Sequence, residues 1–222
     1  MNKSKFMKLF VICCACISAA PSAWSQQPAE IRTAPNDSAS AQNKQSAEAN
    51  AEAEIDVAAA LDAEAEVRFK QAEAAFNKTM KTSLYDPKHP ERYVDRDFQK
   101  QLLEKSRLIS DAVDIYMDVI GNYRSAKWGV ASMTRIGMML QDLADQLIAV
   151  PTPEGLAEDV RIAYKKQYTD YSIQTYDKAV ALYTTVVQKG PDHGIDDEYV
   201  QEAKKRLAYI ESLPIYVEHK NR

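Results

Sequence analysis

Apolar residues recur at steps of three and four along most of the chain after residue 50, which is the period of helices that bury one face. No stretch alternates apolar and polar residues as a half-buried strand would. Glycine is scarce, at 6 of 222 residues, and the turn-forming residues fall between the periodic runs. The pattern therefore predicts an all-α protein.

Prolines and glycines divide the periodic part into five expected helices. Two prolines follow the first helix, a Pro-Thr-Pro segment follows the third, and Pro214 ends the fifth. Gly190 and Pro191 are expected to cap the fourth helix, and Asp196 or Asp197 to cap the fifth at its start. The expected helices cover residues 51–80, 95–123, 125–149, 156–189 and 196–213, and the tail 214–222 is expected to lie back on the surface.

The first 25 residues have the layout of a secretory signal peptide. Three lysines precede an apolar run of 12 residues, 9–20, and small residues follow it. That run is shorter than the ~20 residues that span a bilayer. We expect cleavage near Ser25, with cleavage after Ala23 as an alternative, and hence a periplasmic or secreted protein. The three cysteines, Cys13, Cys14 and Cys16, all lie in this segment, so membrane contact is expected only if one of them is lipidated, as in an outer-membrane lipoprotein.

The acidity of the chain belongs to its leading part. Residues 26–66 hold nine acids and two bases, whereas residues 67–222 hold 23 of each. A nucleic-acid-binding protein would need a basic face, so that class of partner is set aside. Residues 26–50 lack large apolar side chains apart from Ile31 and are expected to be a disordered linker. Residues 51–80 are rich in Ala and Glu and are expected to form a helix.

One short pattern occurs twice, 67 residues apart. Residues 111–123 read DAVDIYMDVIGNY and residues 178–190 read KAVALYTTVVQKG. In each, an alanine (Ala112, Ala179) precedes a tyrosine (Tyr116, Tyr183) by four residues. The small residue permits close approach of a neighbouring helix, and the ring one turn later fills the space beside it. A repeated pattern of this kind predicts a repeated helix pair that buries its face by stacking on the next pair.

Over residues 95–213 this pattern resembles the tetratricopeptide repeat (TPR) family. Ala179, Tyr183 and Pro191 match the second-helix alanine, aromatic residue and closing proline of its 34-residue unit. Ala112 and Tyr116 match in the same way, and 67 is close to two units. An aromatic residue opens the helix after each pattern, Trp128 in the first case and Tyr199 in the second.

Two departures from the family indicate degenerate repeats. Arg124 stands where the first closing proline would be, and Ala131 and Ser132 replace the usual Leu-Gly pair. The resemblance implies antiparallel helix pairs stacked as a short solenoid. It points to TPR proteins of the bacterial cell envelope, of the outer-membrane assembly or gliding-motility type, which act as scaffolds for other proteins and perform no chemistry.

The sequence offers no constellation for catalysis or cofactor binding. His89, His193 and His219 have no second histidine or cysteine at ligand spacing. Asp196 and Asp197 lie near His193 but lack the spacing of a calcium loop. There is no phosphate-binding glycine loop and no nucleophile elbow. We therefore expect a protein that is not an enzyme and holds no metal or cofactor.

Tyrosine is the residue type that stands out, with 12 in the chain. Tyr164, Tyr168 and Tyr171 follow one helical stripe. The stripe predicts either a core seam with hydroxyls at its rim or a groove that contacts a partner. Tyr176 falls off the stripe and is expected to be the exposed contact.

These expectations give three hypotheses for function. The first is a periplasmic scaffold that binds other envelope proteins through apolar and tyrosine contacts. The second is a self-associating helical bundle in which residues 51–80 pair with a second copy. The third is a small-ligand-binding protein with a pocket between the helices expected at 125–149 and 156–189.

Overall fold

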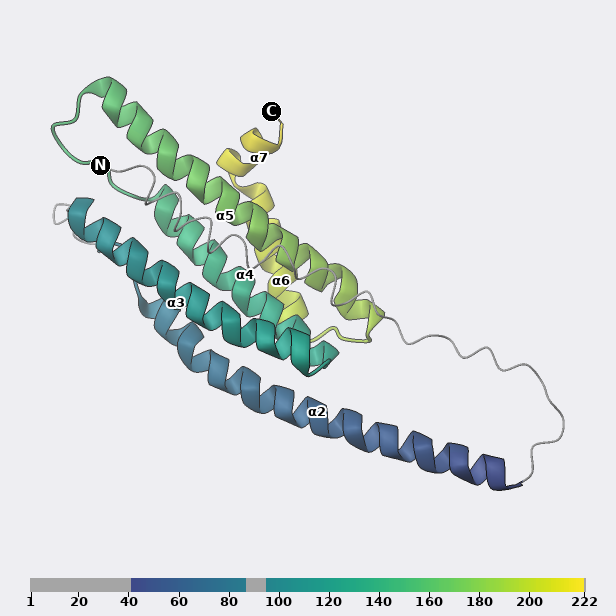
Figure 1. Ribbon diagram of the computed structural model, residues 1–222. Coiled ribbons are helices and arrows are strands. Elements are labelled where there is room, and N and C mark those ends of the chain that lie inside the picture. The colour runs from purple at the N-terminus through teal and green to yellow at the C-terminus, as the bar shows by residue number, and fades with distance from the viewer. Residues whose placement is uncertain (1–40, 87–94, 222) are drawn as a thin grey trace.

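The computed structural model describes residues 41–86 and 95–221, with side chains described for 57–86 and 97–221 (Figure 1). This part of the chain is all-α and contains no strand. The predicted signal peptide, residues 1–25, and the greater part of the predicted linker lie outside it. The helices are α2 (Ala41–Lys81), α3 (Asp95–Asn122), α4 (Ala126–Ile148), α5 (Glu158–Asp192), α6 (Glu198–Ser212) and α7 (Pro214–Lys220).

Helix α4 lies at the centre of the molecule. It packs against α2, α3, α5 and α6. Each helix from α2 to α6 also contacts its neighbour in sequence. Helices α2 to α5 run alternately up and down (Figure 1). Fifteen residues of α4 are buried, and most of them are apolar or small, as expected for a helix surrounded by other helices.

Helix α2 begins at Ala41, ten residues before the predicted start, and its first turns extend past the other helices (Figure 1). Residues 41–50, which the sequence assigned to the linker, thus belong to α2. Residues 41–50 contain Ala, Gln, Glu and Lys but neither proline nor glycine, and these residues favour helix even where no core supports them. Where α2 meets the bundle, Ala65, Phe69, Ala72 and Phe76 form its buried stripe.

Both copies of the repeated pattern bury their small residue and their ring. Ala112, Tyr116, Ala179 and Tyr183 all have an exposed fraction of 0%. Tyr116 packs on α2, where its ring centroid lies 5.6 Å from that of Phe69. Tyr183 packs on α4 and donates to Gln141 Oε1 at 3.1 Å. Each pattern thus faces the helix that precedes it in the chain.

The end of α5 differs from the prediction. Pro191 is exposed and lies in the last turn of the helix, and Gly190 is buried inside the helix instead of capping it. The cap is a Schellman motif centred on Gly194, whose φ is +69°. Ile195 N–H donates to Gly190 O and Gly194 N–H donates to Pro191 O, both at 2.9 Å. Gly190 serves close packing, because a Cβ there would lie 2.9 Å from Val200 Cγ2.

Single side chains fix the start of α6 and the position of the tail. Asp197 accepts from the N–H groups of Tyr199 and Val200, which confirms one of the two capping residues expected from the sequence. Beyond it, the tail forms α7, with Pro214 in its first turn. Tyr216 of α7 is buried and donates to Asp177 Oδ1 on α5 at 2.9 Å, so the tail does lie back on the domain.

Candidate functional site

The predicted tyrosine stripe of α5 belongs largely to the core. Tyr168 is 5% exposed, and its ring centroid lies 5.4 Å from that of Phe98 and 4.8 Å from that of Tyr164. Tyr164 and Tyr171 are half-buried and pack against the same core. The stripe therefore joins the start of α5 to the start of α3.

Tyr176, predicted as the exposed contact, is instead 1% exposed. Its hydroxyl donates to Asp145 on α4, and its ring meets that of Tyr216 edge-on at 6.2 Å. The prediction is wrong because it judged exposure from one helical stripe, whereas α7 folds back over this side of α5. Burial raises the pKa of Tyr176 well above its ordinary value, and the hydrogen bond to Asp145 adds to this effect.

A charged network missed by sequence reasoning joins α2, α3 and α4. Arg135 donates to both carboxylate oxygens of Glu73, at 2.9 and 3.0 Å, and Tyr116 donates to Glu73 Oε1 at 2.6 Å. The Arg135 guanidinium also lies over the rings of Phe76 and Tyr199, at 4.7 and 5.2 Å. Because these residues are widely separated in sequence, no local pattern could have revealed the network. The carboxylate, guanidinium and hydroxyl groups hydrogen-bond to one another, so the network links the three helices and has a structural role.

Trp128, expected to pack between repeats, is 8% exposed and lies at the start of α4, next to Ser125, which caps that helix. Its ring centroid is 5.0 Å from that of Phe69 on α2. Ser125 also donates to Asp62 Oδ1 at 2.5 Å. These contacts hold the start of α4 against the middle of α2.

A second polar feature that the sequence did not indicate is a fully buried lysine. Lys105 of α3 is 0% exposed, and its Nζ donates to Asp142 Oδ2 on α4 and to Thr82 O just beyond the end of α2, both at 2.5 Å. A lysine at this place satisfies the carbonyls that the last turn of a helix leaves unpaired. Lys105 thus fixes the end of α2 to α3 and α4.

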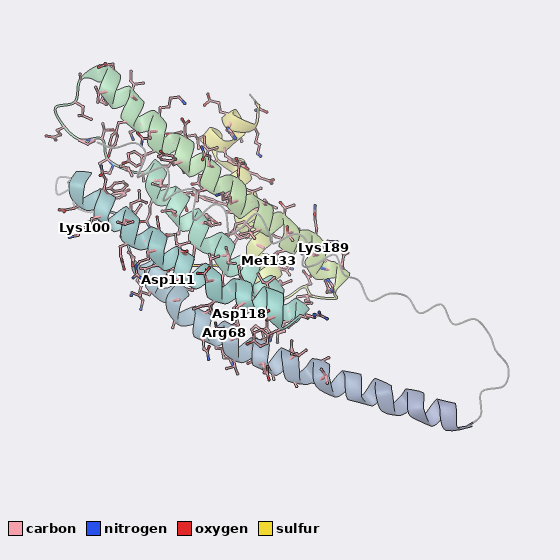
Figure 2. The ribbon with its side chains drawn as sticks, in the orientation of Figure 1. Arg68, Lys100, Asp111, Asp118, Met133 and Lys189 are labelled. Carbon is pink, nitrogen blue, oxygen red and sulfur yellow. The ribbon has the colours of Figure 1, made fainter. Side chains whose placement is uncertain are left out.

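The outer edge of α2 and α3 carries a surface hollow of about 480 Å³. We call its lining residues the α2–α3 edge: Ala63, Glu64, Val67, Arg68, Gln71, Asp118 and Tyr123. Arg68 and Asp118, both labelled in Figure 2, are joined within this lining by an ion pair, in which Arg68 Nε donates to Asp118 Oδ2 at 2.7 Å. Val67 is 58% exposed, and Val57 three turns earlier on α2 is 59% exposed.

The charges at this edge are acidic on balance. A hydrogen bond from Asn122 lowers the pKa of Asp118 below its ordinary value, partial burial opposes the shift, and Arg68 reinforces it. Asp118 is therefore a carboxylate at neutral pH. Glu64 lies beside it, and the one arginine is engaged by Asp118 and by Gln71 Oε1 at 3.1 Å. The arrangement offers exposed apolar groups framed by carboxylates, which suits the binding of another chain.

Among the side chains that the structure describes, those of residues 57–86 and 97–221, no three of His, Cys, Asp or Glu are placed to hold a metal ion together. No helix in the same part of the chain is long and apolar enough to cross a bilayer. Comparisons with family models, with curated proteins and with solved structures find no match to this chain.

Proposed function

We propose that this protein is a non-catalytic scaffold that binds other proteins of the bacterial cell envelope. The observation that carries the proposal is the α2–α3 edge, where Val67 is 58% exposed in the lining of a hollow of about 480 Å³; Val57, earlier on the same helix, is also exposed. An exposed apolar side chain at a surface hollow, with further exposed apolar residues along the same helix, suits a site of protein–protein contact. The mechanism is binding, with apolar contacts for affinity and carboxylates for orientation.

The packing of the two repeated patterns supports a TPR-like origin for this scaffold. Each pattern lies on the second helix of a pair and packs against the first, Tyr116 on α2 and Tyr183 on α4. The first helices of successive pairs also meet, because α2 contacts α4 and α4 contacts α6. Stacked helix pairs with this connectivity present extended surfaces to partner proteins.

The envelope location rests on the sequence of residues 1–25. A signal peptide cleaved near Ser25 would deliver the protein to the periplasm or the medium. Lipidation of a cysteine in that segment is the alternative, and it would attach the protein to a membrane. Mass spectrometry of the protein isolated from envelope fractions distinguishes a cleaved chain that begins near Gln26 from a lipid-modified one.

Self-association through residues 51–80 is the second candidate function, because α2 extends past the bundle and Val57 is exposed on it (Figure 1). Charge opposes this candidate: residues 41–66 hold seven acids and one base, so two copies of this stretch repel. Sedimentation of the purified protein over a range of concentrations and salt tests it. A monomer throughout favours the scaffold, and a stable oligomer favours self-association.

Binding of a small ligand by the α5 tyrosines gains no comparable support. Tyr168 and Tyr176 are buried in the core. The hollow that Val67 lines does not involve α5; it lies between α2 and α3. A thermal-shift screen of small molecules that gives reproducible stabilisation, abolished by Tyr164→Ala, would revive this function.

Site-specific photocrosslinking in intact cells tests the scaffold. A photoreactive residue at position 67 is compared with one at Leu103, which is 50% exposed on α3 but does not line the edge. The expected result is a defined crosslink to an envelope protein from position 67 and none from 103. The same bands from both positions, or none from any exposed position of the protein, would contradict the proposal.

A further inference from the structure

We infer that the α2–α3 edge binds a basic amphipathic helix of a partner protein. The inference rests on the proposed scaffold function and names the surface and the chemistry of the partner segment. It depends on three features of the edge: the line of its apolar side chains, the sign of its charges, and the neighbouring ends of α2 and α3.

Exposed apolar residues of α2 form a line that leads into the edge, where Ala63 and Val67 line the hollow. Val57, Ala60, Ala63 and Val67 follow one another at steps of three or four residues, and all four are exposed. At a rise of 1.5 Å per residue this line is about 15 Å long, which matches the apolar stripe of a helix of three turns. Tyr123, just past the end of α3, also lines the hollow. The long, narrow form of the line favours an extended helical element over a compact domain.

The charges beside this line determine the sign of the partner. Glu64 and Asp118 present carboxylates in the lining of the edge, and Arg68 is occupied by Asp118 and Gln71. The first part of α2, which includes Glu64 and most of the line, is acidic as a whole, with seven acids and one base over residues 41–66. Lysine or arginine on both flanks of an apolar stripe complements this surface. A second copy of α2 would bring acids against acids, which excludes it as the preferred occupant.

The two ends of the helix array differ in a way that supports an added helix at α2. At the far end, α7 covers α5: Tyr216 is 2% exposed and donates to Asp177, and its ring packs on Tyr176. At the other end of the array, α2 packs its buried stripe against α3 and α4, and Val57 and Val67 remain exposed. A partner helix laid on the α2–α3 edge would extend the array by one element.

The test uses the purified protein and synthetic peptides of about 18 residues, five turns of helix. The probe peptide consists of Leu, Ala and Lys, with Leu at steps of three and four and Lys on the flanks. One control peptide has the same composition in scrambled order, so it keeps the charge and loses the stripe. A second control has Glu in place of each Lys. Binding is followed by fluorescence anisotropy at low and physiological salt.

The expected result is saturable binding of the probe peptide, at least tenfold tighter than binding of either control. Val67→Glu should weaken binding of the probe at least tenfold, and Leu103→Glu, at a half-exposed position of α3, should leave it unchanged. Glu64→Lys should weaken the probe and strengthen the peptide with Glu. Circular dichroism and the midpoint of thermal unfolding verify that each variant is folded, which is expected because all three positions are exposed.

Equal binding of the probe and scrambled peptides would show a charge effect without a helix site and would overturn the inference. Binding that neither Val67→Glu nor Glu64→Lys alters would place the site elsewhere, with the same consequence. A dimer of the protein that Val67→Glu dissociates would make a second copy the occupant and would also overturn it. If peptide binding behaves as expected but no partner crosslinks to position 67 in cells, the edge chemistry stands and the scaffold function fails. If a crosslinked partner contacts the edge through an acidic or extended segment, the scaffold function stands and this inference fails.

Discussion

The ring of Tyr183 lies directly against the backbone of Gly137, in the contact between α5 and α4. A Cβ built on Gly137 would lie 2.6 Å from Tyr183 Cε1 and 2.9 Å from Cζ. The ring cannot withdraw, because Tyr183 is 0% exposed and its hydroxyl is held by Gln141. The close approach of the two helices therefore requires glycine at position 137, and this contact gives the second repeated pattern its packing partner.

Gly137→Ala should destabilise the protein for this reason. Overpacking of a close contact costs about 1–3 kcal/mol, which exceeds the ~1 kcal/mol that alanine gains over glycine in helix propensity. The free energy of unfolding in urea measures the effect. Gly121→Ala is the matched control, since Gly121 lies inside α3 with nothing within 4 Å of its built Cβ. That variant should be neutral or more stable. Equal effects at both positions would show that the Gly137–Tyr183 contact does not limit packing.

Glu73→Ala should lower the free energy of unfolding by about 2 kcal/mol, because it removes the shared acceptor of Arg135 and Tyr116 and leaves two partly buried donors unsatisfied. Two turns earlier on α2, Glu66 makes only an exposed ion pair with Lys70. Glu66→Ala should therefore have little effect. If both substitutions have the same small effect, the network contributes nothing beyond a surface ion pair.

Lys105→Met should be the most damaging of the single substitutions described here. It removes a fully buried ammonium, leaves the carbonyl of Thr82 without its donor, and leaves Asp142 with the hydrogen bond from Gln146 but without its charged partner, at a cost of about 3 kcal/mol. Chemical denaturation provides the measurement, with Lys100→Met on the exposed face of the same helix as the control. Wild-type stability in Lys105→Met would mean that water replaces the lysine at the end of α2.

Asp145 should make stability fall as the pH rises through the acidic range. Burial raises the pKa of Asp145 above its ordinary value. Asp142 adds to the shift, and Tyr176, Arg206 and Gln141 reduce it. The folded protein therefore binds the proton more tightly than the unfolded chain does, and this contribution is lost as pH rises from below the ordinary value through the raised one. Asp145→Asn keeps an acceptor for Tyr176 and has no proton to lose.

Urea unfolding from pH 4 to pH 7 gives the measurement. The stability of Asp145→Asn relative to the wild-type protein should increase as the pH rises. Glu104→Gln provides a control of opposite sign, because the hydrogen bond from Arg107 lowers the pKa of Glu104. Its stability relative to the wild-type protein should decrease over the same range. A relative stability of Asp145→Asn that is flat in pH would show that Asp145 titrates as an ordinary carboxyl.

The α2–α3 edge was not indicated by the sequence, although its residues are ordinary ones. In the sequence, Val67 is one apolar residue in the Ala- and Glu-rich stretch 51–80, and Asp118 is one of several acids in the first repeated pattern, so no local signal marks either of them. What joins them is the register of α2 against α3, which places Arg68 opposite Asp118 across 50 residues of chain. The periodicity of either helix alone carries no information about that register.

The sequence by itself determined the class of the protein and the approximate extent of its helices. The period of its apolar residues, the prolines between runs and the capping carboxylate of Asp197 are local features that act within one or two turns, so they hold whatever the helices pack against. The tertiary structure decided which side chains are exposed. Tyr176 is buried because α7 folds onto α5, and Val67 is open because no described helix lies on that side of α2. Exposure depends on every helix that surrounds a residue, and those neighbours are brought together only by folding.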